Sequence, residues 1–242
     1  KDAVIHLAGA PVAAHSWTPD YKEEIINSRV LSTRNLVQGM QQNDRKPDVF
    51  ISASAIGYYG NTFDTEINEE SPAADDFLGK VCAAWEAEAA QAEPLGIRRV
   101  SVRIGIVLST KDGALSKLLT PFRLFIGGPL GNGKQWFSWV HIDDIVRAFL
   151  HVLDTPEIHG AVNCTAPQPV RMKDFAKRLG KVLRRPSLFP VPEFVLKFIL
   201  GESAQAVLSG QKVNPVQLIN HQFVFLFPEV SDALKDILSN RK

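Results

Sequence analysis

Residues 51–60 of the chain read Ile-Ser-Ala-Ser-Ala-Ile-Gly-Tyr-Tyr-Gly. They continue a short apolar run over residues 48–51, which predicts a buried β-strand. Small hydroxyl side chains then replace large ones, and this leaves room at the end of the strand for something other than protein. In an open parallel α/β sheet, ligands bind at this end of the strands. The stretch therefore predicts a pocket rim carrying the hydroxyl of Ser54 and the phenol of Tyr58 or Tyr59, although a tight turn from strand to loop would give a similar sequence.

Strand and helix patterns alternate around this stretch. Strand-like runs cover residues 3–8, 48–54 and 100–108. Each is separated from the next by a helical pattern. Thr18 is suited to cap the first helix, and Asp75 and Asp76 are suited to cap the second. The order β-α-β-α-β is typical of a parallel sheet with helix crossovers.

The sequence changes character after the third strand. Residues 111–139 combine glycine turns with Phe and Trp, which predicts a loop region that covers a site. A helix face begins at Ile142, and we expect Asp143 and Asp144 to cap this helix. Further expected elements are a strand at 160–165 and helices near 172–183, 192–200 and 230–238.

We expect these elements to form two parts. The first is a Rossmann-like α/β domain over residues 1–165, and the second is a small, mostly helical module over residues 166–242. A core parallel strand needs neighbours on both sides, yet the strand at 3–8 begins almost at the first residue. The sequence therefore predicts a truncated parallel sheet that lacks its leading strands.

Composition argues against several classes of partner. Lys and Arg number 27 against 26 Asp and Glu, so the net charge gives no basic surface for nucleic acid. No apolar run approaches the ~18 residues that a membrane span needs. Cys82 and Cys164 lie far apart, which argues against a disulfide scaffold or a metal site and fits a reducing compartment. We predict a cytoplasmic protein without a nucleic acid, membrane or metal partner, and the sequence gives no oligomeric state.

Several motifs occur in the order of one known superfamily. They are His6–Gly9, Ser52–Gly60, Val102–Leu108 and Trp139–Asp144. These motifs resemble the fourth, fifth and sixth strands, and the segment before a late helix, of the extended and atypical short-chain dehydrogenases/reductases. More closely, the chain resembles sugar-nucleotide-epimerase-like members, which also carry a glycine loop and a carboxyl-terminal module of the DUF1731 type. Here the loop is Gly127–Gly133, and Gly210–Val213 marks the module.

The resemblance implies a cofactor and a set of site residues. The expected cofactor is NADP, with NAD as the alternative, and the expected substrate is a small molecule. The cofactor contacts that it implies are Leu7, Ala8, Gly9, Arg29, Ser52, Ala53 and Arg103. The catalytic residues that it implies are Ser54, Tyr58 and Tyr59. The hydroxyl would orient the substrate, and one phenol would donate a proton.

Two features depart from the family pattern. The G-x-x-G-x-x-G turn that binds pyrophosphate is absent, so we expect about 50–60 residues, or two β-α units, to be missing. The Tyr-Lys dyad is also missing, because Leu78 and Cys82 occupy its positions. Lys80 is present but lies about 200° around the helix. Arg29 replaces a helical Asn and suits a phosphate or carboxylate.

The sequence leaves the function open between two hypotheses. The first is an NAD(P)-dependent oxidoreductase or a nucleotide-sugar-epimerase-like enzyme, in which the cofactor supplies hydride chemistry. The second is an NADP(H)-binding protein without turnover, which the missing dyad favours. A pure interaction module would leave the hydroxyls at the sheet end unexplained. His141 is either a structural hydrogen-bonding residue or a general base, and Trp136 and Trp139 either line the pocket or belong to the core.

Overall fold

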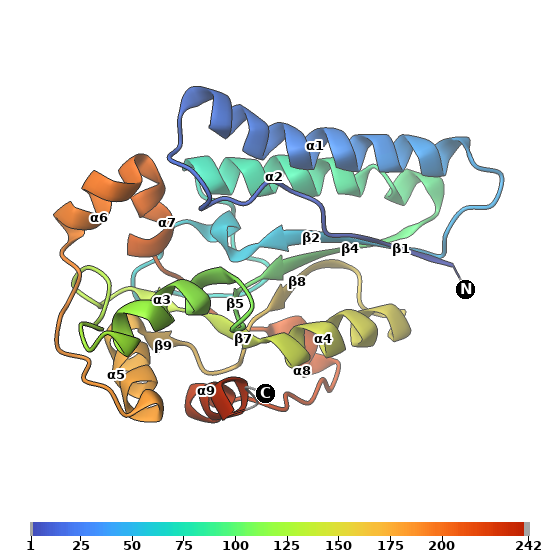
Figure 1. The fold of residues 1–242 in the computed structure, drawn as a ribbon. Helices are drawn as coiled ribbons and strands as arrows, with labels where there is room; N and C mark the ends of the chain where they lie inside the picture. Colours follow the sequence, from blue (N-terminus) through green and yellow to red (C-terminus); the bar gives the residue numbers. More distant parts are fainter. Residues whose placement is uncertain (1, 240–242) are drawn as a thin grey trace.

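The computed structural model describes residues 2–239 and contains a four-stranded parallel sheet (Figure 1). Its strands, in spatial order, are β1 (Ala3–His6), β2 (Val49–Ala55), β4 (Arg98–Ile104) and β8 (Gly160–Cys164). All three neighbouring pairs are parallel. The predicted α/β class, a Rossmann-like sheet with helix crossovers, is confirmed.

Helices cover both faces of this sheet (Figure 1). One face carries α1 (Pro19–Gln42) and α2 (Phe77–Ala90), and the other carries α4 (Ile142–Asp154) and α8 (Val216–Asn220). Successive residues of β2 point to opposite faces, as the period of a strand requires. Phe50 packs in the cluster with α1 and α2, whereas Val49 and Ile51 pack in the cluster with α4. Burial on both faces explains why β2 reads as an unbroken apolar run.

The predicted capping residues hold two of the three helix starts. The hydroxyl of Thr18 accepts a hydrogen bond from the Tyr21 amide, and Asp76 accepts one from the Gly79 amide. At α4 the prediction is wrong. Its N-cap is His141, whose Nδ1 accepts a hydrogen bond from the Asp143 amide at 3.0 Å.

The expected strand over residues 100–108 is divided at Gly105. Downstream of it, β5 (Ile106–Leu108) leaves the main sheet and pairs in parallel with β7 (Trp139–His141). A Cβ at Gly105 would lie 2.7 Å from Thr165 Cγ2 and 2.8 Å from the Ser138 carbonyl oxygen. Only a residue without a side chain allows the backbones to approach this closely.

The glycine-rich region 111–139 is not a loop throughout. It contains α3 (Gly113–Arg123), which Asp112 caps, and the short strand β6 (Trp136–Phe137). The apolar face of α3, formed by Leu115, Leu119 and Phe122, is fully buried. Glycines on both sides of this short helix concealed its 3–4 spacing in the sequence.

The carboxyl-terminal part packs against the rest of the chain. Besides α8, its elements are β9 (Val170–Arg171), α5 (Met172–Leu183), α6 (Glu193–Leu200), α7 (Gln205–Leu208), β10 (Lys212–Val213) and α9 (Val230–Ser239). Strand β9 pairs with β6, and β10 pairs with β3 (Glu66–Ile67). Short 3-10 helices occupy Ile56–Tyr59, Glu93–Leu95 and Gly201–Ala204. Helices α6 and α7 lie beyond the end of the sheet toward which the strands run (Figure 1). No helix within residues 2–239 has the length and apolar character that crossing a membrane requires.

Candidate functional site

A cavity of about 290 Å³ lies at the carboxyl end of β2. Ala55, Ile56 and Gly57 form the side toward the sheet, and residues from helix α2 form another. The chain around α7 completes it through Gln205 and other side chains of the carboxyl-terminal part. Most of the lining is apolar, and the position agrees with the general location of ligand sites in parallel sheets.

The positions of the missing dyad lie in the wall of this cavity. Leu78 and Cys82 both line it, whereas Lys80 is exposed and is not part of the lining. Burial raises the pKa of the Cys82 thiol to about 12. Because a leucine and a neutral thiol stand at these two positions, neither a phenol nor an ammonium group is offered there to a bound molecule.

Ser54 lies next to the cavity but is almost fully buried. Its Oγ donates a hydrogen bond to Glu86 Oε1 at 2.6 Å, and the residue is 2% exposed. Sequence reasoning missed Glu86, although a signal was present. Leu78, Cys82 and Glu86 are spaced by four residues and so share one face of α2.

Arg103 is occupied by protein partners. It is 4% exposed, and its Nε and Nη2 each lie 2.8 Å from an oxygen of Glu86. Its Nη1 donates to the Tyr59 hydroxyl at 2.7 Å and to the Glu69 carbonyl oxygen at 3.0 Å. Burial lowers the pKa of Arg103, but the hydrogen bonds and charge of Glu86 outweigh this and raise the pKa overall. The cofactor contact implied for Arg103 is therefore not supported by its position.

The two tyrosines have different surroundings. Tyr59 is 4% exposed, and its hydroxyl donates to Asn163 Oδ1 at 2.7 Å. Burial raises the pKa of Tyr59 to about 12. Its hydroxyl is held in a buried network, so the position of Tyr59 argues against the predicted catalytic role. Tyr58 is half-buried, and the Arg103 Cζ lies 3.5 Å from its ring centroid.

The other predicted cofactor contacts divide by exposure. Leu7, Ala8 and Gly9 follow β1 and are exposed, Leu7 by 62%. Ser52 and Ala53 are buried within β2, and the Ser52 hydroxyl donates to a backbone carbonyl. Of these five residues, Leu7, Ala8 and Gly9 are the exposed ones.

Arg29 contributes a charged group to the cavity wall. It extends from α1, and its Cζ lies 5.1 Å from the Trp85 ring centroid. Its Nη1 donates to the Ile25 carbonyl oxygen within the helix, and burial lowers its pKa. Asp76 is the other charged lining residue, and its two oxygens accept hydrogen bonds from the Gly79 amide and from Gln205.

A second cavity of about 510 Å³ adjoins the first and has a polar lining. Trp136 lines both cavities, and the Arg171 Cζ lies 4.0 Å from its ring centroid. Trp139 is fully buried and belongs to the core around α3 and α5. Of the two tryptophans, Trp136 therefore lines the pocket and Trp139 belongs to the core.

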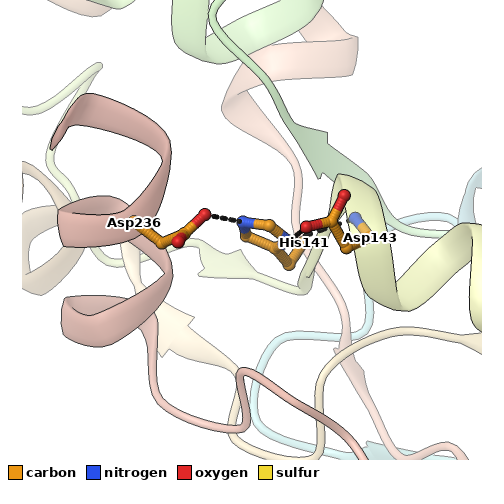
Figure 2. Close-up of side chains that lie close together, drawn as sticks. All are labelled: His141, Asp143 and Asp236. Atoms are coloured by element: carbon orange, nitrogen blue, oxygen red, sulfur yellow. Dashed lines mark hydrogen bonds and ion pairs between the residues drawn. The ribbon is translucent and has the colours of Figure 1, made fainter. Parts of the chain in front are cut away.

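Figure 2 shows a separate cluster at the start of α4, in which His141 lies between Asp143 and Asp236 of α9. Their ligand atoms lie within 4.8 Å of one another, a spacing that a metal ion could bridge. However, Nδ1 of His141 already accepts the Asp143 amide, so its lone pair is engaged. Nε2 lies 3.4 Å from Asp236 Oδ2, an ion-pair distance without hydrogen-bond geometry. The cluster joins α4 to α9, and His141 has the structural role that was one of its two interpretations.

The parallel sheet, its helix crossovers and the cavity at its carboxyl edge define a Rossmann-like α/β protein. The chain belongs to the NAD dependent epimerase/dehydratase family, whose model matches residues 1–164. Residues 191–237 match the model of DUF1731, a domain of unknown function. The resemblance drawn from the motifs is thus confirmed.

Known proteins resemble the chain over nearly all of its length. The epimerase family protein SDR39U1 homolog, chloroplastic, of Arabidopsis thaliana is 43% identical over 98% of this chain and 68% of the relative. The epimerase family protein YfhF of Bacillus subtilis is 37% identical over 100% of this chain and 79% of the relative. A crystal structure of human SDR39U1 (isoform 2) with NADPH superposes with a TM-score of 0.95 at 33% identity, over 99% of this chain and 82% of that one.

Proposed function

We propose that the protein is an NADP(H)-dependent oxidoreductase that reduces a small carbonyl compound in the cavity at the end of β2. The observation that carries the proposal is the cavity itself, which begins at Ala55, the residue after Ser54, and is lined on another side by the carboxyl-terminal part. The NADPH named for the human relative supports the choice of cofactor. A nucleotide-sugar epimerase reaction is the variant of this function that the family name supports.

The residues after β1 fit the cofactor. Leu7, Ala8 and Gly9 form an exposed, mostly small segment at the carboxyl end of a parallel strand, where dinucleotides bind in this fold. When bound, the nicotinamide supplies hydride chemistry. In this proposal Ser52 and Ala53 shape the strand beneath the cofactor and do not touch it.

Ser54 and Tyr58 are the proposed chemical groups. Neither is in the cavity lining, but each is next in sequence to a lining residue, Ala55 or Gly57. Because the Ser54 hydroxyl donates to Glu86, its oxygen can accept a hydrogen bond from a bound molecule. The Tyr58 hydroxyl makes no hydrogen bond to the described residues, so it is the phenol that can donate a proton to a carbonyl oxygen. A neutral phenol donates more readily than it accepts, which favours reduction over oxidation.

Residues 166–242 form the proposed substrate-side module, and Gln205 and Gln211 in the cavity wall support this division of the chain. The cytoplasmic location and the absence of nucleic acid and membrane partners stay predictions.

A second candidate is an NADP(H)-binding protein without turnover. Leu78 and Cys82, which line the cavity in place of the dyad, favour it.

Fluorescence of NADPH on binding, followed by a screen of carbonyl compounds for NADPH oxidation, tests both candidates. For the oxidoreductase we expect Ser54→Ala and Tyr58→Phe to lower kcat by about 100-fold or more, with NADPH affinity unchanged. Ser116→Ala on α3 is the matched control and should leave kcat unchanged. NADPH binding without oxidation of any carbonyl compound would favour the second candidate, and absence of NADPH binding would exclude both.

A further inference from the structure

We infer that Arg29 binds an anionic group of the small molecule that occupies the cavity, so that the ligand is a compact molecule with an apolar body and one carboxylate or phosphate. The inference names the substrate class of the proposed function. It rests on that function only in calling the ligand a substrate. The cavity and the charge of Arg29 are observed in this structure independently of the proposed function.

The first support is the unmatched charge of Arg29. Within residues 2–239, Arg29 forms no ion pair, and its one hydrogen bond goes to a backbone carbonyl of its own helix. The other charged lining residue, Asp76, is engaged by the Gly79 amide and Gln205. A cation partly removed from water without a negatively charged partner carries a desolvation cost that an anionic ligand would offset.

The second support is that Arg29 is held in place. Its guanidinium lies against the Trp85 ring, with Cζ 5.1 Å from the centroid. A Cβ at Gly9 would lie 2.9 Å from Arg29 Cζ, so the glycine makes room for the guanidinium. A fixed guanidinium presents its remaining N–H groups to an anion with little loss of conformational entropy.

The size and lining of the cavity define the rest of the ligand. Its volume of about 290 Å³ is just below the ~300–1,000 Å³ typical of small-molecule sites. The wall around Arg29 includes Val12, Val81 and Trp85, none of which carries a charge. A molecule bound there therefore has a compact apolar body, and an anionic group at the end that meets Arg29.

Two matched probes test this inference by calorimetry, with and without saturating NADPH. Phenylacetate carries the anion, and phenylacetamide has nearly the same shape without the charge. We expect phenylacetate to bind at least about 10-fold more tightly than phenylacetamide, because the amide lacks the negative charge and the second acceptor oxygen that the carboxylate offers to the guanidinium. Arg29→Met should remove this preference, and Arg29→Lys should restore part of it. Arg34→Met, on the same helix and exposed, is the control and should behave as the wild type.

Equal binding of the two probes, absence of binding of both, or a preference that survives Arg29→Met would overturn the inference. An NADPH affinity that falls 10-fold or more in Arg29→Met while the probe preference persists would also overturn it, since Arg29 would then serve the cofactor. If NADPH does not bind but the carboxylate preference depends on Arg29, the anion site stands and the oxidoreductase proposal fails. Thermal unfolding of each variant confirms that it is folded.

Discussion

Arg103 and Tyr59 illustrate how position decides the role of a residue. Both residue types are common at catalytic and cofactor sites, and the sequence placed both beside the pocket. In the structure each is 4% exposed. Arg103 donates hydrogen bonds to Glu86 and Tyr59 donates one to Asn163, within one buried network. The network connects β2, α2, β4 and β8, so it stabilises the sheet end on which the cavity is built. Burial of a polar side chain could not be read from its identity alone, because the sequence does not show which partners surround it.

The raised pKa of Tyr59 leads to a prediction about pH. The phenol titrates near 10 in an unfolded chain, whereas in the folded protein burial raises the pKa of Tyr59 to about 12. As pH rises, the unfolded state releases this proton before the folded state does. The contribution of the Tyr59 phenol to the free energy of unfolding is therefore fully present below pH ~10 and is lost between pH ~10 and ~12. We expect Tyr59→Phe to destabilise the protein by about 1–3 kcal/mol at pH 8, because Arg103 and Asn163 lose a partner.

Urea unfolding at pH 8 and pH 11 measures this effect. The difference between wild type and Tyr59→Phe should narrow by about 1 kcal/mol at the higher pH, since only the wild type loses the contribution of this phenol. The buried thiols of Cys82 and Cys164, whose pKa values are also raised to about 12, are common to both proteins and cancel. An equal difference at both pH values would mean that the Tyr59 phenol titrates normally.

At the scale of elements, regular patterns were predictable and close approaches were not. Helix α5 has the predicted bounds, residues 172–183, because its apolar residues repeat at helical spacing without interruption. The cavity edge at the end of β2 was also predictable, since small residues replace large ones there. The division at Gly105 was not, because the atoms that exclude a side chain come from Ser138 and Thr165, far along the chain. The sequence also showed that Leu78 and Cys82 stand in place of the Tyr-Lys dyad. It did not show that these two residues line a cavity, because that cavity depends on the position of α7.

Gly105 provides the prediction at this scale. We expect Gly105→Ala to destabilise the protein by about 1–3 kcal/mol, because the added methyl would lie 2.8 Å from a backbone oxygen that cannot rotate away. Gly39→Ala in the last turn of α1 is the control, since its added Cβ would meet no neighbouring atom within 4 Å. That change should stabilise the protein by up to about 0.5–1 kcal/mol through helix propensity. Urea unfolding measures both, and a Gly105→Ala protein as stable as the wild type would show that the segments carrying Ser138 and Thr165 can move away from residue 105 at no cost.

Over the whole molecule, the predicted boundary at residue 165 does not coincide with a gap in the core. Side chains of α3 and β7 share one apolar cluster with side chains of α5 and α9. Strand pairing also crosses the boundary, since β6 pairs with β9 and β3 pairs with β10. The division into two parts stays a prediction about evolution and function. We expect the two parts to unfold together, because neither completes its core alone.

Asp144 connects the two parts and provides the last prediction. It is fully buried on α4, and its two oxygens accept hydrogen bonds from the amides of Leu226 at 2.8 Å and Phe227 at 2.9 Å. Asp144→Asn replaces one acceptor by a donor that faces an amide, so a buried N–H loses its partner. We expect a loss of about 2–4 kcal/mol and faster proteolysis within residues 221–239. Asp143→Asn, one residue away and 62% exposed at its side chain, is the matched control and should change stability by less than about 0.5 kcal/mol.

The Asp144→Asn variant also shows whether the segment after α8 unfolds together with the sheet or opens independently. If Asp144→Asn destabilises the whole protein in a single urea transition, the segment after α8 is part of the common cooperative unit. If proteolysis within residues 221–239 accelerates while the urea midpoint stays unchanged, that segment opens independently of the sheet. Because α9 also meets His141 through Asp236, such local opening would break a second connection to α4 and expose His141, which is 1% exposed in the folded protein. Hydrogen–deuterium exchange at the His141 ring carbon measures this exposure. Faster exchange in Asp144→Asn, but not in Asp143→Asn, would identify Asp144 as the residue that keeps the carboxyl-terminal helix attached to the sheet.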